Sequence, residues 1–157
     1  MELFSWVEIM FIFCTAILIG YYLGFWRKLS IFKASDKSFS EFPFVSVVIC
    51  SKDEADNLVQ FIPEFLSQDY PNYEVIVVDD SSSDDSSIIL SDLSNKYQHL
   101  SVFKFDKKRY SQGKKEVLEY GIGQAKSNYL VLTDADCRPN SSRWLKTMVN
   151  GFSDGSE

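Results

Sequence analysis

The chain begins with a nearly unbroken apolar run. The run covers residues 3–26 and contains one charged residue, Glu8. Its length and composition are typical of a helix that spans the hydrocarbon core of a membrane, which takes about 20 apolar residues. Because no basic residue precedes the run and no small-x-small cleavage site follows it, we expect residues 1–28 to be a transmembrane anchor rather than a cleaved signal peptide.

The charges that flank the apolar run predict its orientation. Basic residues follow the run, whereas its leading end offers only Glu2 and Glu8; the basic residues are Arg27, Lys28, Lys33 and Lys37. Positive charge is retained on the cytoplasmic side of a membrane, so we expect a single span in the cell membrane with the soluble part in the cytoplasm. Residues 29–43 carry mixed Ser and Lys without periodicity and are interpreted as a juxtamembrane linker that ends at Pro43.

From residue 44 onward, short β-branched runs alternate with segments that have helical spacing. Strands are predicted at residues 44–50, 73–78 and 100–105 and from Tyr129 onward. Helices are predicted after Asp56, at about residues 84–97 and 114–125, and after Ser142. This alternation indicates an α/β fold with a parallel sheet, right-handed crossovers and helices on both faces. The run that starts at Tyr129 is continuously apolar, so we expect that strand to be buried on both faces.

Acidic and polar clusters follow three of the four predicted strands. The clusters are residues 51–54 (Ser-Lys-Asp-Glu), residues 79–80 (Asp-Asp) and residues 134–136 (Asp-Ala-Asp). Since ligands bind beyond the carboxyl ends of strands in open α/β sheets, these clusters are expected to converge at one edge. In an extended chain, Asp134 and Asp136 leave the same face, and a hard divalent cation would neutralise them.

A simpler interpretation of each cluster is a turn or a helix cap, because Asp and Ser are favoured in both. For the pair Asp79 and Asp80, periodicity leaves open which residue is the cap and which the ligand group.

Composition excludes several other classes. The 157-residue chain has a net charge of −6 and no basic stripe, which argues against nucleic-acid binding. Neither a G-x-G-x-x-G nor a phosphate-binding P-loop sequence is present, so dinucleotide and P-loop folds lose support. The three cysteines form no paired framework and are expected to be reduced.

Four motifs, in order along the chain, resemble family 2 glycosyltransferases of the GT-A fold. They are Val-Ser-Val-Val-Ile before residues 51–54, the stretch 75–84, Gly113-Lys114-Lys115, and Thr133 to Asp136. The resemblance implies that residues 44–157 are the nucleotide-sugar-binding part of a GT-A (Rossmann-like) domain. The implied activity is metal-assisted transfer of a sugar, with inversion, from a nucleoside-diphosphate sugar to an envelope glycan or lipid-linked acceptor.

The resemblance also implies roles for the acids. Asp80 matches the family's nucleotide-base carboxylate. Asp134 matches the first acid of the D-x-D motif, near the ribose and a metal-bound water, and Asp136 matches the last acid, the direct ligand of Mg²⁺ or Mn²⁺. Asp53 and Glu54 fall where the family usually has Asn-Glu beside the nucleoside.

Two lysines complete the donor-binding set that the resemblance implies. Lys114 follows the glycine of the family's Gly-Lys element and would lie near the diphosphate, although a solvated lysine at a helix start explains it equally well. Lys52 stands where the family commonly has Tyr or Arg, which puts base stacking in doubt.

No residue can be assigned as the general base that an inverting transfer needs. Family members continue beyond the D-x-D motif with an acceptor-binding half, so the sequence is interpreted as partial. The alternative is a membrane-tethered nucleotide-binding module or truncated pseudoenzyme without turnover. A nucleotidyltransferase is less consistent with the sequence, because residues 51–57 contain none of the glycines expected after the first strand.

Overall fold

The computed structural model describes residues 2–30, 42–106 and 113–151 and separates into two compact units, residues 1–36 and 37–157. The described part of the first unit is one helix, α1 (Glu2–Ser30), with Arg27 and Lys28 in its last turn. Its segment Ser5–Lys28 is long and apolar enough to cross a membrane.

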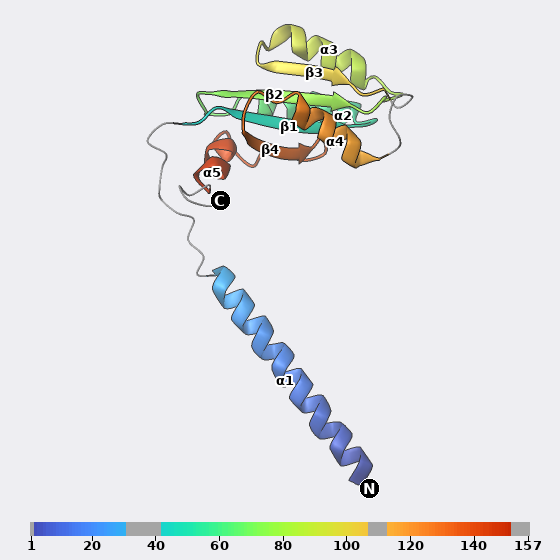
Figure 1. Cartoon of the computed structure of the whole chain (residues 1–157), viewed down its shortest axis with the longest axis vertical. Coiled ribbons are helices and arrows are strands. Elements are labelled where there is room, and N and C mark those ends of the chain that lie inside the picture. Colours follow the sequence, from blue (N-terminus) through green and yellow to red (C-terminus); the bar gives the residue numbers. More distant parts are fainter. Residues whose placement is uncertain (1, 31–41, 107–112, 152–157) are drawn as a thin grey trace. The chain divides into compact units, whose positions relative to one another are not determined.

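The described residues of the second unit form a four-stranded parallel sheet with the order β3-β2-β1-β4 (Figure 1). The strands are β1 (Val45–Ser51), β2 (Tyr73–Asp79), β3 (Leu100–Lys104) and β4 (Tyr129–Asp134). The helices are α2 (Ala55–Phe65), α3 (Ser86–Lys96), α4 (Lys114–Gly123) and α5 (Trp144–Asn150). The predicted α/β fold is therefore confirmed. Helix α3 begins two residues later than predicted. Asp84 lies in the loop before it, where its carboxylate accepts hydrogen bonds from the amides of Ala55 and Ser86.

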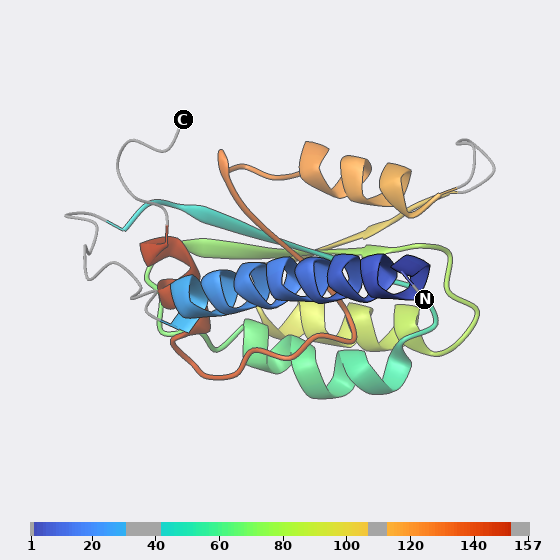
Figure 2. The same cartoon turned by 90° about the horizontal axis from the view of Figure 1, so that it is seen from below.

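Helices cover both faces of the sheet, as the alternating pattern predicts. Successive strand residues point to opposite faces, so Val75 and Val77 pack in one cluster and Ile76 and Val78 in another. The first cluster is closed by buried side chains of α2, α3 and α5, and the second by Val117 of α4. Figure 2 shows α4 on one side of the sheet and α2 and α3 on the other.

The prediction that the last strand is buried on both faces is wrong. In β4 only Val131 is buried, whereas Tyr129 and Leu132 are 41% and 47% exposed. Strand β4 pairs with β1 alone and forms an edge of the described sheet, while β1 and β2 are the central, buried strands. An apolar run shows that the side chains are hydrophobic, but it does not show whether a neighbouring strand or helix covers them.

The register of the sheet brings the ends of three strands to one level. Ser51 of β1 lies opposite Asp79 of β2, and Cys50 lies opposite Asp134 of β4. The amide of Asp80 also donates to the carbonyl of Ser51 at 2.9 Å. Because all strands run in the same direction, the residues that follow these ends emerge at the same edge.

Candidate functional site

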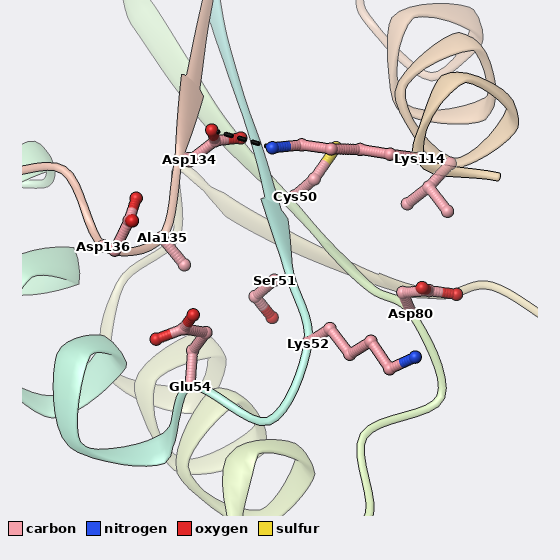
Figure 3. Close-up of a pocket in the computed structure, with 10 residues that line it drawn as sticks. Cys50, Ser51, Lys52, Glu54, Asp80, Lys114, Asp134, Ala135 and Asp136 are labelled. Atoms are coloured by element: carbon pink, nitrogen blue, oxygen red, sulfur yellow. Dashed lines mark hydrogen bonds and ion pairs between the residues drawn. The ribbon is translucent and has the colours of Figure 1, made fainter.

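A cavity of about 240 Å³ lies at this carboxyl edge of the sheet (Figure 3). Six of the residues that the sequence singles out line it: Lys52, Glu54, Asp80, Lys114, Asp134 and Asp136. They come from the ends of β1, β2 and β4 and from the first residue of α4. The structure thus gathers these six side chains around one space, as the strand-end argument requires.

Asp134 and Asp136 reach the cavity by a different route from the one the sequence predicts. Strand β4 ends at Asp134, and the amide of Cys137 donates to the Asp134 carbonyl at 3.1 Å, which closes a turn over residues 134–137. Ala135 inside this turn is buried, whereas Asp136 is exposed. The two carboxylates therefore share a cavity because the chain turns, not because an extended strand alternates.

The charges lining the cavity favour a cation. Four carboxylates face it, those of Glu54, Asp80, Asp134 and Asp136, against the two ammonium groups of Lys52 and Lys114. The Nζ of Lys114 lies 2.9 Å from Oδ2 of Asp134, and both side chains are solvent-accessible. The hydrogen bond to Asp134 and the charge of that carboxylate raise the pKa of Lys114. The lining thus carries two more carboxylates than ammonium groups, a balance that favours a bound cation.

Asp53 is the one predicted site residue that the structure does not place in the cavity lining. Its backbone is left-handed, with φ of 54°, a conformation that Asp tolerates better than most residues. Its carboxylate accepts hydrogen bonds from the amide of Ser83 at 2.6 Å and from its hydroxyl at 3.0 Å, and these bonds lower the pKa of Asp53. Asp53 therefore holds the loop after β2 against the loop after β1, and its contact with a donor stays a prediction.

The structure separates the two acids after β2. Asp79 is buried, and its Oδ1 accepts a hydrogen bond from the amide of Ser82 at 3.0 Å, as a turn residue does. Asp80 lines the cavity. Of the two possibilities that the sequence leaves open, Asp79 supports the turn and Asp80 faces the cavity.

Cys50 and Ser51 also line the cavity, although from the sequence Ser51 had no role beyond its place in the cluster 51–54 and Cys50 was interpreted only as reduced. The hydroxyl of Ser51 is buried and has no hydrogen-bond partner among the described residues. Burial, and then the charge of Asp134, raise the pKa of the Cys50 thiol to about 11. The two residues are the last two of the buried strand β1, and that position was the signal that could have identified them.

The oxygen donors at the cavity fit a divalent cation that is shared with a ligand. No group of three or more His, Cys, Asp or Glu side chains in the described ranges is close enough to form a complete metal cage. Mg²⁺ is commonly held by one or two carboxylates together with substrate phosphates and water. Asp134 and Asp136 supply two carboxylates of that kind beside a cavity with room for phosphates.

A doubly covered parallel sheet with an acidic cavity at its carboxyl edge places the second unit among the open α/β domains, in which ligands bind at that edge. Residues 46–157 match the family described as Glycosyl transferase family 2, and the chain belongs to this family. The predicted family is thereby confirmed, and the likeness to solved structures confirms the predicted GT-A fold.

Among curated relatives, glycosyltransferase AglE of Haloferax volcanii is 35% identical over 116 residues, which are 73% of this chain and 37% of that protein. The beta-monoglucosyldiacylglycerol synthase of Trichormus variabilis is 29% identical over 149 residues, 92% of this chain and 31% of that protein. The chain thus spans about a third of the length of these relatives.

Solved structures show the same fold. The mannosyltransferase PcManGT of Pyrobaculum calidifontis, in complex with GDP-Man and Mn²⁺, superposes with a TM-score of 0.75 at 25% identity, over 90% of this chain and 43% of that one. S. aureus TarS in complex with UDP-GlcNAc gives a TM-score of 0.59 at 25% identity, over 67% of this chain and 30% of that one. These neighbours bind nucleotide sugars, and the first does so with a divalent cation.

Proposed function

We propose that this chain is the donor-binding part of a membrane-anchored glycosyltransferase that takes a sugar from a nucleoside-diphosphate sugar. The observation that carries the proposal is the convergence of six charged side chains from three strand ends and one helix start in a single cavity. A surplus of carboxylates is poorly suited to phosphates alone, but it suits a metal–diphosphate pair. Family membership and the nucleotide sugars of the solved relatives support the same assignment.

In the proposed complex, Asp134 and Asp136 would hold Mg²⁺ or Mn²⁺, with Asp136 as the direct ligand. Such an ion supplies positive charge to the diphosphate that departs from the sugar. Lys114, which begins α4 at the rim of the cavity, adds a second positive charge on the diphosphate side. The ion and the Lys114 ammonium would both stabilise the negative charge that grows on the diphosphate as its bond to the sugar breaks.

The nucleoside end of the donor is proposed to lie against the ends of β1 and β2. Asp80 would accept a hydrogen bond from a base N–H, since a carboxylate is an acceptor only. Lys52 also lines the cavity on the side of Asp80 (Figure 3), while Glu54 lines it nearer Asp136 and Asp53 holds the loop that contains Ser83. The base itself is not specified by these groups.

The acceptor is proposed to be a lipid-linked or envelope glycan presented at the membrane. Helix α1 would serve as the anchor, and the basic residues Arg27 and Lys28 at its end favour a cytoplasmic domain. The Trichormus relative is named for a glycolipid product, which supports a lipid acceptor. We assign the general base to no described residue.

A donor screen tests this function. The full chain in detergent would be titrated with UDP-, GDP- and dTDP-sugars, with and without Mn²⁺, and thermal unfolding recorded. We expect one nucleotide series to raise Tm only when Mn²⁺ is present. No shift with any nucleotide sugar would contradict the proposal. Binding without release of nucleoside diphosphate on addition of membrane lipids would instead favour a nucleotide-binding module without turnover.

A further inference from the structure

The sheet holds the turn that carries Asp136 on its upstream side but not on its downstream side. Upstream, the amide of Ala135 donates to the Cys50 carbonyl at 3.3 Å, at the end of the β1–β4 ladder. Downstream, residues 137–143 contain no helix or strand, and Cys137 and Arg138 are exposed. Burial of apolar surface therefore does not fix Cys137 and Arg138 themselves; Pro139 just beyond them is buried, and polar contacts hold the stretch as well.

Those contacts come from the end of α2, far away in the sequence. The guanidinium of Arg138 forms a two-pronged ion pair with Glu64: Nε lies 3.0 Å from Oε2, and Nη2 lies 2.8 Å from Oε1. This paired geometry fixes direction as well as distance, because two parallel bonds join two planar groups. Arg138 is two residues beyond Asp136, so its position limits where the turn can lie.

Gln68 makes the second set of contacts and is only 8% exposed. Its side-chain nitrogen donates to the carbonyls of Glu64 at 2.9 Å and Ser141 at 3.2 Å. Its side-chain oxygen accepts from the amide of Leu145 at 3.0 Å, in the first turn of α5. One buried amide thus joins the end of α2 to both ends of the segment between Ser141 and Leu145.

A backbone bond and a cavity complete this arrangement. The amide of Asp69 donates to the Ser142 carbonyl at 2.7 Å. A cavity of about 220 Å³ lies between the two segments and is lined by them. Since open space rather than close packing separates them there, loss of the polar bonds would leave the segment room to shift.

We propose that Glu64 and Gln68, called here the α2 clamp, are positioning residues that hold Asp136 in place for the divalent cation. They do not line the acidic cavity that holds Asp134 and Asp136, and they act through Arg138, Ser141 and Leu145. The inference rests on the proposed function, because it assigns the clamp a role in metal binding. Ligand groups must be held to within about 0.5 Å by supporting contacts, and such contacts can change metal affinity severalfold without touching the ion.

Variants of the α2 clamp and of its partner Arg138 test this inference. Arg138→Met removes the exposed half of the ion pair, and Gln68→Met keeps the side-chain volume but removes three hydrogen bonds. The charge exchange Glu64→Arg with Arg138→Glu restores the ion pair in reverse. The matched control is Lys126→Met, which removes the ion pair of Lys126 with Glu74 at the opposite end of the sheet.

The readout is the affinity of the full chain in detergent for Mn²⁺, alone and with UDP or GDP, followed by the electron paramagnetic resonance signal of the free ion. We expect each single clamp variant to weaken binding by about fivefold, and the charge exchange to recover most of that loss. Lys126→Met is expected to bind like the wild type. Thermal unfolding, recorded in parallel, separates loss of fold from loss of metal.

Wild-type affinity in folded Arg138→Met and Gln68→Met would overturn the clamp and leave the proposed function intact. Equal weakening in Lys126→Met would also overturn it, because the effect would then follow stability alone. If the wild type binds no Mn²⁺ under any of these conditions, the metal site of the proposed function fails and the clamp fails with it.

Discussion

The Nζ of Lys114 lies 2.9 Å from Oδ2 of Asp134, so the first residue of α4 is ion-paired to the last residue of β4 across the mouth of the cavity. The same carboxylate is one of the two proposed metal ligands. A divalent cation and the Lys114 ammonium would therefore compete for Asp134. With a donor and a cation bound as proposed, the ammonium would be released from Asp134 and could turn toward the diphosphate.

Replacing Lys114 tests this competition. In Lys114→Met, Mn²⁺ alone is expected to bind about two- to fivefold more tightly, the scale of an exposed ion pair. Affinity for nucleoside diphosphate in the presence of Mn²⁺ is expected to fall, because a positive charge near the phosphates is lost. Calorimetric titration measures both. Lys115→Met is the matched control, since it makes the same charge change one residue away, outside the cavity lining; identical shifts in both variants would point to net charge rather than to the contact.

The close approach of α4 to the sheet gives a prediction about stability. A Cβ on Gly121 would lie 2.8 Å from Cγ1 of Val48 and 2.9 Å from Cγ2 of Val78, both of them buried side chains in central strands. Gly121→Ala is therefore expected to lower the free energy of unfolding by about 1–2 kcal/mol, although alanine is the better helix former. Gly123→Ala is the control, because nothing lies within 4 Å of its Cβ position. Urea unfolding compares the two, and equal stability would show that α4 is not tightly seated.

The hydrogen bonds of Glu74 lead to a prediction of how the stability of the fold changes at low pH. Burial alone would raise the pKa of this carboxyl, but hydrogen bonds from Lys126 and Ser46 outweigh burial and lower it below the ordinary value of 4.5. The bonds are 2.9 Å from the Lys126 amide, 3.0 Å from its ammonium and 2.8 Å from the Ser46 hydroxyl. A lowered folded-state pKa contributes stability above the unfolded-state pKa, and that stability is lost as pH falls through the folded-state value.

Glu74→Gln is accordingly expected to be about 1–2 kcal/mol less stable than the wild type at pH 7. Most of this loss comes from the hydrogen bonds of the Ser46 hydroxyl and the Lys126 amide, because the Lys126 ammonium is solvent-exposed and its ion pair contributes little. The difference from the wild type is expected to shrink below pH 4.5, as the wild-type carboxyl takes up its proton. Denaturant unfolding across pH 3–7 (a range of about four units that brackets ordinary Glu titration) measures this. The exposed Glu119→Gln serves as control, and a gap of constant size at every pH would contradict the role given to Glu74.

The convergence of the acidic residues could be predicted from sequence because it follows from the direction of the strands alone. Parallel strands present their carboxyl ends at one edge, so Asp80 and the pair Asp134 and Asp136 had to emerge together once the fold was α/β. The helices on both faces could be predicted for a similar reason, since strand-to-strand crossovers require them.

What sequence could not predict depends on three-dimensional neighbours. The exposure of Leu132 depends on β4 being an edge strand, and the turn at Ala135 depends on where pairing with β1 stops. The outward placement of Asp53 depends on a left-handed backbone that its residue type allows but does not demand. The contacts of Gln68 join segments more than seventy residues apart and leave no local signature.

The central claim is that Asp136 and its neighbours bind a cation that holds the diphosphate of a sugar donor. Calorimetric titration of the wild type and Asp136→Asn with UDP and GDP, each with and without Mn²⁺, tests it most directly. Asp92→Asn on the exposed face of α3 is the control for charge. We predict that the wild type and the control bind one nucleotide in a Mn²⁺-dependent manner and that Asp136→Asn loses that dependence. An Asp136→Asn protein with wild-type affinity, both with and without Mn²⁺, would contradict the account.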